Sequence, residues 1–562
     1  MHLFFTTKKM TGHRAVETLV VFWAFLFVAQ QQQPYGQCAA FSFCSPHSTL
    51  RRPHRSTVWG GHEPQQQWWP QRADDQQLLI CPPSIGRSET MLASRSAVGK
   101  LRFQQVEEVN VEVRPQKQGK EAFFDWKRQW YPVAIIQDLE ARDSRQPYHA
   151  QLLGEAFVVW KDAKHGEWKA FANRNGATVI PTKILENKLW LWPDTSPDGI
   201  KESEMVEPVT IPGINLDSGD FGGQWFARDL PYGADTLIEN LVDPAHAPFA
   251  HHGLLGHRSS GGAVPIEIDE EAGSGKDSFL STNTGFLGSK NMKVGFRAPG
   301  LVYFENDYTE TLDAMVKKVL PAPLRAMFWI MKMLHVDKKI SMKDEDRKDK
   351  SDRLLFYFVG YAVPIAPGKC RIFARNARNF FLQHPVIPRC FRNSVAENHL
   401  REHSVLDGDS HVLHLQERFL ANAGHHGVKQ AEKVFYMPTS SDTALRCFRT
   451  WYNSRGGSGP PWPQGIDPSD LGRVLPREET LDRWAHTKEC HACSKAFKVS
   501  GAMKHISAGF TLLLLGAAAT LPRGSLSIGL ATGALASAGF SVAMSRRQQK
   551  FVFVDYVHAK HD

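Results

Sequence analysis

The chain has 562 residues, of which 42% are hydrophobic and 11% aromatic. This composition excludes a disordered or fibrous protein and leaves room for a leader and more than one folded domain. The formal net charge is +9, and about half of it falls in residues 1–100, so we expect no nucleic-acid partner. The 8 cysteines show no spacing typical of a disulfide framework, which fits a reducing compartment.

The first segment, residues 1–100, has the pattern of a two-part targeting leader. Basic residues precede the apolar run 19–29, which has the form of a secretory signal peptide and is short for a membrane span. A stretch rich in Ser, Arg and Pro follows, as in a transit peptide. The combination resembles the leader of proteins sent to complex plastids. A secreted protein with a disordered head is the alternative.

A stretch reading ENLVDPAHAPFAHHG contains Asn240, Asp243, His246 and His251 in the pattern N-x-x-D-x-x-H-x-x-x-x-H. On a regular helix the two histidines point apart, but Pro248 between them should bend or end the helix. Two neutral imidazoles and one carboxylate form the facial triad of oxygen-activating ferrous enzymes. Asn240 and Asp243 would orient a ring nitrogen or hold the helix. The alternative is a pair of polar surface histidines.

Three segments further along are less specific. Residues 261–276 and the highly charged residues 343–352 are predicted to be loop insertions. Residues 321–339 are rich in Met and aromatic side chains with interleaved basic residues. We interpret them as a core helix, with a helix that docks on a membrane surface as the alternative.

The third metal ligand must come from elsewhere in the chain. The segment 406–417 offers Asp407 and Asp409 at the start of a predicted helix. We expect Asp409 to be the ligand, with Asp407 as the alternative. The competing interpretation is that both are helix N-terminal acids favoured by the macrodipole.

Cys490 and Cys493 form a C-x-x-C pair, a spacing that permits a disulfide and tunes the thiol pKa. We interpret the pair as a redox switch rather than an inert pair. Zinc binding would need two further ligands, for which His486 and His491 are candidates.

Two apolar segments without charged side chains, 506–521 and 525–544, stand near the C-terminus, separated by a Pro-Arg-Gly turn. Each is near the minimum length of roughly 17 residues for a membrane span. Basic residues flank the pair on both sides, which predicts a transmembrane helical hairpin with both ends on one side of the membrane. A buried helical pair inside the folded domain is the alternative.

With these residues in place, the sequence resembles the pheophorbide a oxygenase family of plastid Rieske-type non-haem iron oxygenases. That family includes chlorophyllide a oxygenase and the Rieske protein of the inner-envelope translocon. The resemblance runs from about Phe123 to the C-terminus. It rests on the segments FFDWKRQWYPVA, LLGEAFVVWKD, LWLWPD, YGADTLIENLVDPAHAPFAHH, ARNFF, LDGDSHVLHLQE, CHAC and FVFVDYVHAK.

The resemblance implies an α+β fold. It places a remnant β Rieske-type domain before a helix-grip catalytic domain, in which a curved antiparallel sheet surrounds a long helix. The expected organisation, by residue range, is a signal peptide and transit region (1–100), the truncated Rieske-like domain (120–195), the catalytic domain (196–480), a C-x-x-C linker (481–504), the transmembrane hairpin (505–546) and a tail (547–562).

The resemblance also implies a function. His246, His251 and Asp409 fall where the family binds mononuclear Fe(II), and Asp243 falls where it bridges toward a neighbouring subunit's cluster. The implied reaction inserts oxygen from dioxygen into a chlorophyll-derived tetrapyrrole, with electrons from a ferredoxin, at the inner envelope or thylakoid membrane. A homotrimer is a family expectation. The C-x-x-C pair of the family is redox-active, which implies thioredoxin as a partner.

One departure from the family concerns its 2Fe-2S cluster, which needs two cysteines and two histidines. The family supplies them as C-x-H and C-x-x-H between the equivalents of WKAF and LWLWPD. Here no cysteine lies between Cys81 and Cys370, and His149 and His165 have no partner cysteines. The cluster cannot be built from this segment. Either the segment is missing from this gene product, for instance through a skipped exon, while the natural protein has it, or the chain is a degenerate copy that acts as a pigment-binding or translocon-associated protein.

Overall fold

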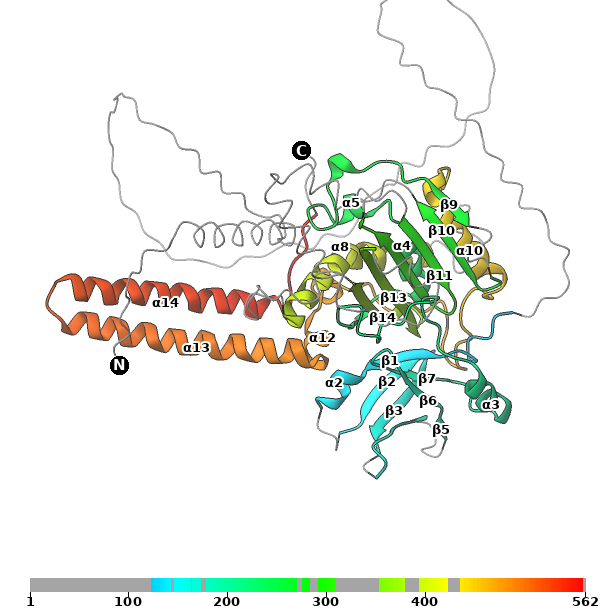
Figure 1. Cartoon of the computed structure of the whole chain (residues 1–562), viewed down its shortest axis with the longest axis horizontal. Helices are drawn as coiled ribbons and strands as arrows, with labels where there is room; N and C mark the ends of the chain where they lie inside the picture. The colour runs from blue at the N-terminus through cyan, green and yellow to red at the C-terminus, as the bar shows by residue number, and fades with distance from the viewer. Residues whose placement is uncertain are drawn as a thin grey trace, which may run out of the picture. The chain divides into compact units, whose positions relative to one another are not determined.

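The structure is a computed structural model (Figure 1). It describes residues 123–142, 146–162, 164–172, 178–269, 275–283, 292–309, 353–379, 394–422 and 435–558. The predicted leader (1–100), the predicted helix 321–339 and the charged segment 343–352 lie outside these ranges.

The described chain contains antiparallel strands followed by helices at the C-terminal end. The strands are β1 (Tyr131–Ile135), β2 (Tyr148–Leu152), β3 (Glu155–Lys161), β4 (Trp168–Ala172), β5 (Val179–Ile180), β6 (Thr182–Leu185), β7 (Lys188–Leu191), β8 (Phe226–Leu230), β9 (Ile266–Asp269), β10 (Ser278–Asn283), β11 (Met292–Arg297), β12 (Leu301–Asp307), β13 (Leu355–Ala366) and β14 (Lys369–Arg378). The helices are α2 (Ile136–Glu140), α3 (Pro197–Met205), α4 (Ala234–Val242), α5 (Ala247–Ala250), η1 (Arg258–Ser260), α8 (Val395–Asn422), η6 (Ser440–Asp442), α10 (Thr443–Ser454), α11 (Arg477–Thr480), α12 (Trp484–Glu489), α13 (His491–Thr520) and α14 (Ser525–Gln549).

The first part of the described chain forms two small antiparallel sheets, with strand orders β1-β7-β6 and β2-β3-β4-β5. On β3, alternate side chains such as Phe157 and Val159 are buried, as expected for a strand with one face on a core. These sheets occupy the range predicted for a truncated Rieske-like domain. Strands β4 and β5, which flank the predicted deletion, pair directly with each other.

The second part is a seven-stranded antiparallel sheet with the order β8-β14-β13-β12-β11-β10-β9. Helix α4 contacts β13 and β14, and α8 contacts β8. The prediction of a mixed α and β fold with antiparallel sheets is therefore confirmed. The prediction that 261–276 is a loop is wrong in part, because Ile266–Asp269 pairs with β10 as strand β9.

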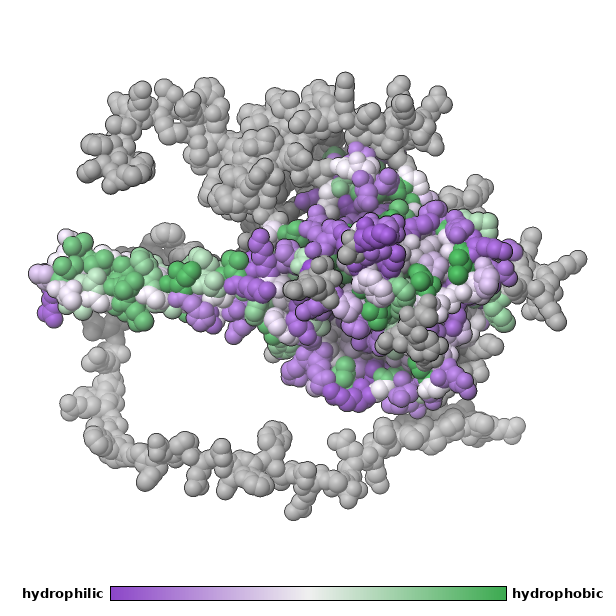
Figure 2. Space-filling view, turned by 90° about the horizontal axis from the view of Figure 1, so that it is seen from below, coloured by the Kyte–Doolittle hydropathy of each residue, from purple (hydrophilic) through white to green (hydrophobic). Residues whose placement is uncertain are grey.

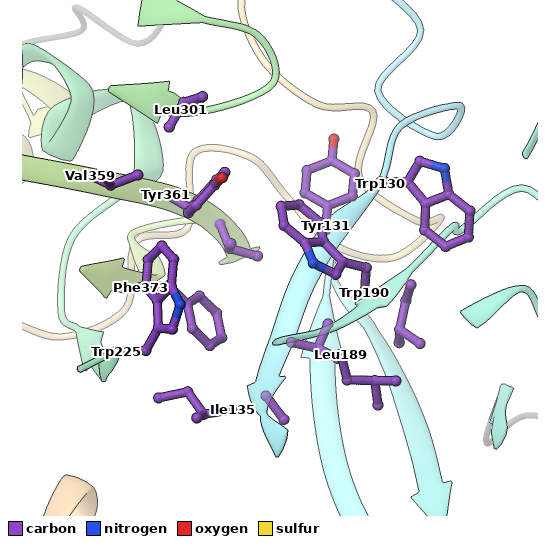
Figure 3. Packing of buried hydrophobic residues seen from close by; sticks show 14 of the residues in the cluster. Trp130, Tyr131, Ile135, Leu189, Trp190, Trp225, Leu301, Val359, Tyr361 and Phe373 are labelled. Atoms are coloured by element: carbon purple, nitrogen blue, oxygen red, sulfur yellow. The ribbon is translucent and has the colours of Figure 1, made fainter. Parts of the chain in front are cut away.

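One of the apolar clusters joins the small sheets to the large one. Figure 3 shows Tyr131 and Trp190, from the small sheets, in the same cluster as Tyr361 and Phe373 of the large sheet. The rings of Trp190 and Tyr361 meet edge to face, with 5.2 Å between centroids. The backbone N–H of Leu153 also donates to the carbonyl of Pro364 at 2.9 Å. The first sheets therefore pack directly on β13.

Helix α8 is one continuous helix of 28 residues. It begins after Ser394, whose hydroxyl accepts a hydrogen bond from the backbone N–H of Glu397 at 3.2 Å. Asp407 and Asp409 therefore lie about three turns inside the helix. The prediction that they stand at a helix start is wrong, and the macrodipole cannot explain them.

Helices α13 and α14 lie side by side as an antiparallel pair (Figure 1). The Ser537 hydroxyl donates to the carbonyl of Ser507 and the Ser541 hydroxyl to that of Lys504. In the most apolar window of each helix only 11% and 6% of residues are buried, so a pair buried inside the fold is not what the chain forms. Both helices are long and apolar enough to cross a membrane, and Figure 2 shows their hydrophobic surface.

Candidate metal centre

The two predicted histidine ligands stand at the two ends of one short helix. Helix α4 ends at Val242 because Asp243, which precedes Pro244, has the extended backbone that proline requires of its predecessor. Pro248 lies in the first turn of α5, where proline is tolerated. The predicted break at Pro248 is therefore wrong, and the chain breaks at Pro244.

His246 is the N-cap of α5 and His251 is its C-cap. Their rings lie 5.4 Å apart between centroids. Asp409 reaches them from α8, with its Oδ2 atom 3.2 Å from His251 Nε2 and 3.9 Å from His246 Nε2. One ligand atom from each residue lies within 4.8 Å of the others. The structure thus brings together the three residues that the sequence nominated.

Asp407, the alternative ligand, points elsewhere. Its carboxylate forms ion pairs of 2.6 Å with both Arg228 of β8 and Arg483, and its side chain is fully buried. Both oxygens are therefore occupied by guanidinium groups. Of the two aspartates, Asp409 is therefore the one whose carboxylate faces the histidines.

Asn240 and Asp243 both contact the ring of His246. Asp243 Oδ2 lies 3.5 Å from His246 Nδ1, and Asn240 Nδ2 lies 3.3 Å from His246 Nε2. The carboxylate of Asp243 favours a proton on Nδ1, which leaves the lone pair on Nε2, and the Asn240 amide meets that same nitrogen while no metal is bound. Burial lowers the pKa of His246, but Asp243 and Asp409 outweigh burial and the pKa is raised.

The residues at this centre fit a ferrous ion. Two ring nitrogens and one carboxylate oxygen converge, and the set leaves other positions open. His251 is 2% exposed and Asp409 is 7% exposed, so the centre is screened from water on the side of α8.

The comparisons with known proteins identify a group of similar plastid proteins. The family model described as pheophorbide a oxygenase matches residues 296–426, a range that includes Asp409. The chain is 26% identical over 583 residues to "Pheophorbide a oxygenase, chloroplastic" of Oryza sativa subsp. japonica, an alignment that covers 88% of this chain and 100% of the relative. It is 27% identical over 552 residues to the protein of the same name from Arabidopsis thaliana, with coverage of 86% and 90%.

The chain is thus similar to pheophorbide a oxygenase over most of its length, and the family model of that name matches one segment of it. A solved structure, NdmA of Pseudomonas putida CBB5 as a QL mutant with theobromine, is similar over 58% of this chain and 90% of that chain, with a TM-score of 0.38 and 14% identity.

The 2Fe-2S cluster expected of the family does not fit this chain. In the range of the small sheets, His149 is exposed on β2, and the exposed His165 pairs with Asp162 at 2.9 Å. Among the described residues, both groups of side chains that could hold a metal lie beyond β8. With no cysteine between Cys81 and Cys370, the small sheets have no sulfur ligands for a cluster.

The C-x-x-C pair lies at the junction of α12 and α13, so part of the predicted linker 481–504 is helical. Both thiols are free and buried. His486 contacts the pair, as one of the two predicted zinc candidates, whereas His491 is exposed. Hydrogen bonding with Cys493, and then with His399 and His486, lowers the pKa of the Cys490 thiol despite its burial. Sequence reasoning missed His399.

The segment after the hairpin closes over the metal centre, which sequence reasoning also missed. The Tyr556 hydroxyl donates to the carbonyl of Ala250 at 2.8 Å, and His558 Nε2 lies 2.9 Å from the carbonyl of Gly408. Burial, and then the charges of Asp409 and Asp407, raises the pKa of Tyr556 to about 12. The similarity of FVFVDYVHAK to the pheophorbide a oxygenase family was the available signal.

Gly408 allows α8, which carries Asp409, to approach His251 and Ala250 closely. A Cβ atom added there would lie 2.8 Å from His251 Nδ1 and 3.2 Å from the carbonyl oxygen of Ala250. We expect Gly408→Ala to displace His251 and weaken Fe(II) binding about 10–100-fold. The fold should survive, since alanine favours a helix interior by about 1 kcal/mol over glycine.

Iron titration of the purified full chain in detergent measures this effect. Gly509→Ala is the matched control, because an added Cβ at that helical glycine meets nothing within 4 Å. Unchanged iron affinity in Gly408→Ala would show that the close approach of α8 does not position His251.

Proposed function

We propose that this chain is a plastid membrane oxygenase that inserts oxygen into a chlorophyll-derived tetrapyrrole at one Fe(II) ion held by His246, His251 and Asp409. The observation that carries this proposal is the convergence of those three side chains in a chain similar to pheophorbide a oxygenase. The names of its relatives, which include pheophorbide a oxygenase and chlorophyllide a oxygenase, supply the substrate class.

The finer organisation belongs to the same proposal. Residues 120–195 are a truncated Rieske-like domain, residues 196–480 a helix-grip catalytic domain, and α13 and α14 a transmembrane hairpin with both ends on one side. The relatives are named as chloroplastic, so the proposed location is the inner envelope or thylakoid membrane. Ferredoxin is the proposed electron donor, thioredoxin a proposed partner and a homotrimer the proposed assembly.

The protein residues have distinct roles at this centre. When bound, ferrous iron offers open positions at which dioxygen and substrate can meet. The His246 and His251 rings and the Asp409 carboxylate would hold it. Asp243 and Asn240 contact the His246 ring from 3.5 Å and 3.3 Å and would hold it in position. Tyr556 and His558 hold α5 and α8 under the C-terminal segment.

The source of electrons for the reaction distinguishes this chain from the family that it resembles. Insertion of one atom of dioxygen into a C–H bond consumes an electron pair and protons and releases water. The small sheets lack the cysteines of a 2Fe-2S cluster. A donor outside the described residues must therefore deliver the electrons in a complete turnover.

A second candidate function follows from the same missing cysteines. A chain that binds a tetrapyrrole but has no cluster would serve as a pigment-binding or translocon-associated protein. The absence of any cysteine between Cys81 and Cys370 favours this candidate, whereas the intact set of His246, His251 and Asp409 favours the enzyme.

Hydrogen peroxide tests the iron centre without a cluster, because it carries both the oxygen atom and the electron pair. A substrate C–H bond and peroxide yield an alcohol and water. We expect the purified full chain, loaded with Fe(II) in detergent and given pheophorbide a with ¹⁸O-labelled peroxide, to form labelled product. His246→Ala should form none. Tight pigment binding without product in the unmodified chain would overturn the enzyme and support the second candidate.

The transcript decides which form of the protein exists. Sequencing across the codons for Phe171 to Pro181 should reveal either an uninterrupted junction or extra in-frame sequence that encodes C-x-H and C-x-x-H. Extra sequence would restore the cluster and a complete Rieske oxygenase. An uninterrupted junction would leave the chain dependent on an outside electron donor.

A further inference from the structure

A second group of metal-ligating side chains lies at the base of the α13–α14 pair. His399 of α8, His486 of α12, Cys490 and Cys493 each direct one ligand atom to a common point, with all four atoms within 4.8 Å of one another. Their exposed fractions are 2%, 6%, 3% and 0%. His486 Nε2 lies 3.3 Å from Cys493 Sγ, and His399 Nδ1 lies 3.5 Å from both sulfur atoms.

The local fold explains three of the four positions. Cys490 is the extended N-cap of α13, and Cys493 lies in its first turn, so both thiols face the same side of the helix start. The backbone N–H of Cys490 donates to the carbonyl of His486 at 2.8 Å, which holds the end of α12 beside the pair. His399 arrives from α8, 91 residues before Cys490 in the sequence.

The hydrogen bonds of His486 leave its ring ready to bind a metal. His486 Nδ1 lies 2.7 Å from the carbonyl oxygen of Ala227. A carbonyl only accepts, so Nδ1 carries the proton and Nε2 directs its lone pair at the sulfur atoms. Second-sphere carbonyls orient metal-bound histidines in this way. The other ring nitrogen of His399, Nε2, is buried without a hydrogen-bond partner. The polar contacts of the His399 ring are therefore those that Nδ1 makes with the two sulfur atoms.

We propose that His399, His486, Cys490 and Cys493 bind one Zn²⁺ ion that ties α8 to the base of the α13–α14 pair. Two thiolates and two imidazoles form a closed tetrahedral set, the type found in structural zinc sites. Two thiolates neutralise the charge of Zn²⁺, which suits a site with four buried ligands. A C-x-x-C disulfide would need neither of the two histidines.

The same ligand types occur in a 2Fe-2S Rieske cluster, but the spacing here fits one ion. In that cluster the cysteines bind one iron and the histidines the other, so the second iron and the sulfides separate the two ligand pairs. Here the histidine nitrogens lie 3.3 Å and 3.5 Å from the sulfurs. The group therefore cannot replace the missing cluster without moving apart.

The zinc ion would also fix the helix that carries Asp409. Asp409 lies ten residues beyond His399 on α8, or about 15 Å along the helix axis. Arg483, one residue before α12, binds Asp407 on the same helix. The zinc site and this ion pair would together set the position of α8 against α12 and α13, which meet beside it in Figure 1.

Metal analysis of the purified full chain in detergent tests the proposal. We expect one zinc per chain in the unmodified protein, and its loss in Cys490→Ser and in His399→Ala. Two controls should keep it: His491→Ala, which changes the exposed histidine inside the C-x-x-C motif, and Cys447→Ser, which changes a free cysteine of α10. The circular dichroism of each variant, compared with that of the unmodified chain, reports that it is folded.

Cobalt gives a second measurement that needs no variant. Co²⁺ exchanged into the unmodified chain should show thiolate charge-transfer absorption and the intense visible bands of tetrahedral cobalt. A chain that binds neither zinc nor cobalt and instead forms a Cys490–Cys493 disulfide would overturn the proposal in favour of the redox switch. Acid-labile sulfide at this site, or full zinc retention in His399→Ala, would also overturn it.

Discussion

Replacing Asp409 with alanine should remove iron from the chain without unfolding it. Asp409 Oδ2 is the carboxylate oxygen nearest to both rings, 3.2 Å from His251 Nε2 and 3.9 Å from His246 Nε2. Loss of a direct ligand should weaken Fe(II) binding more than the about 10–100-fold expected for an outer partner. Alanine is the best helix former, and Asp409 lies inside α8, so the helix should persist.

Iron content after gel filtration, with the circular dichroism of the same sample, measures both parts of this expectation. Val412→Ala is the matched control, because Val412 is half-exposed one turn further along α8. Peroxide-dependent product should disappear together with the iron. If Asp409→Ala retained stoichiometric iron, the carboxylate of the centre would have to be another residue.

The histidine pair could be predicted from the sequence because its geometry is local. His246 and His251 stand five residues apart, at the two ends of α5, and a proline-rich stretch brings them together. The predicted position of the helix break was wrong because the prediction assigned it to Pro248. The restriction that Pro244 imposes on Asp243 ends α4 earlier.

The choice between Asp407 and Asp409 needed partners far away in the chain. Arg228, which holds Asp407, lies 179 residues before it, and Arg483 lies 76 residues after it. No local pattern shows that one of two neighbouring aspartates is paired with arginine. The same limit hid His399, which meets Cys490 across 91 residues.

The extent of α8 was hidden for a different reason. Its buried face carries polar side chains at helical spacing, among them His399, His403, Asp407, Ser410 and His414. A search for hydrophobic residues at a period of 3.6 finds little on such a helix. The polar face itself is the functional signal, because buried polar groups need specific partners.

Replacing Asp407 with alanine should destabilise the whole domain by about 3–5 kcal/mol, the cost of breaking a buried ion pair. Arg228 and Arg483 each have side chains 2% exposed, and both pair with this one carboxylate at 2.6 Å. The variant would leave two guanidinium charges in the protein interior with no carboxylate between them. Denaturant unfolding of the full chain in detergent, followed by tryptophan fluorescence, measures the loss.

Replacing the whole buried ion cluster with apolar residues distinguishes the structural role of Asp407 from a role in iron binding. The triple variant Asp407→Leu, Arg228→Met and Arg483→Met should recover most of the lost stability, since apolar replacement of a buried ion cluster is often neutral or stabilising. It should also bind iron, because Asp409 and both histidines remain. A stable Asp407→Ala chain that had lost its iron would reverse the assignment and make Asp407 the ligand. The two aspartates are two residues apart and so lie on different faces of α8. Their variants should therefore fail in different ways: Asp409→Ala as a folded apoprotein, and Asp407→Ala as a destabilised chain.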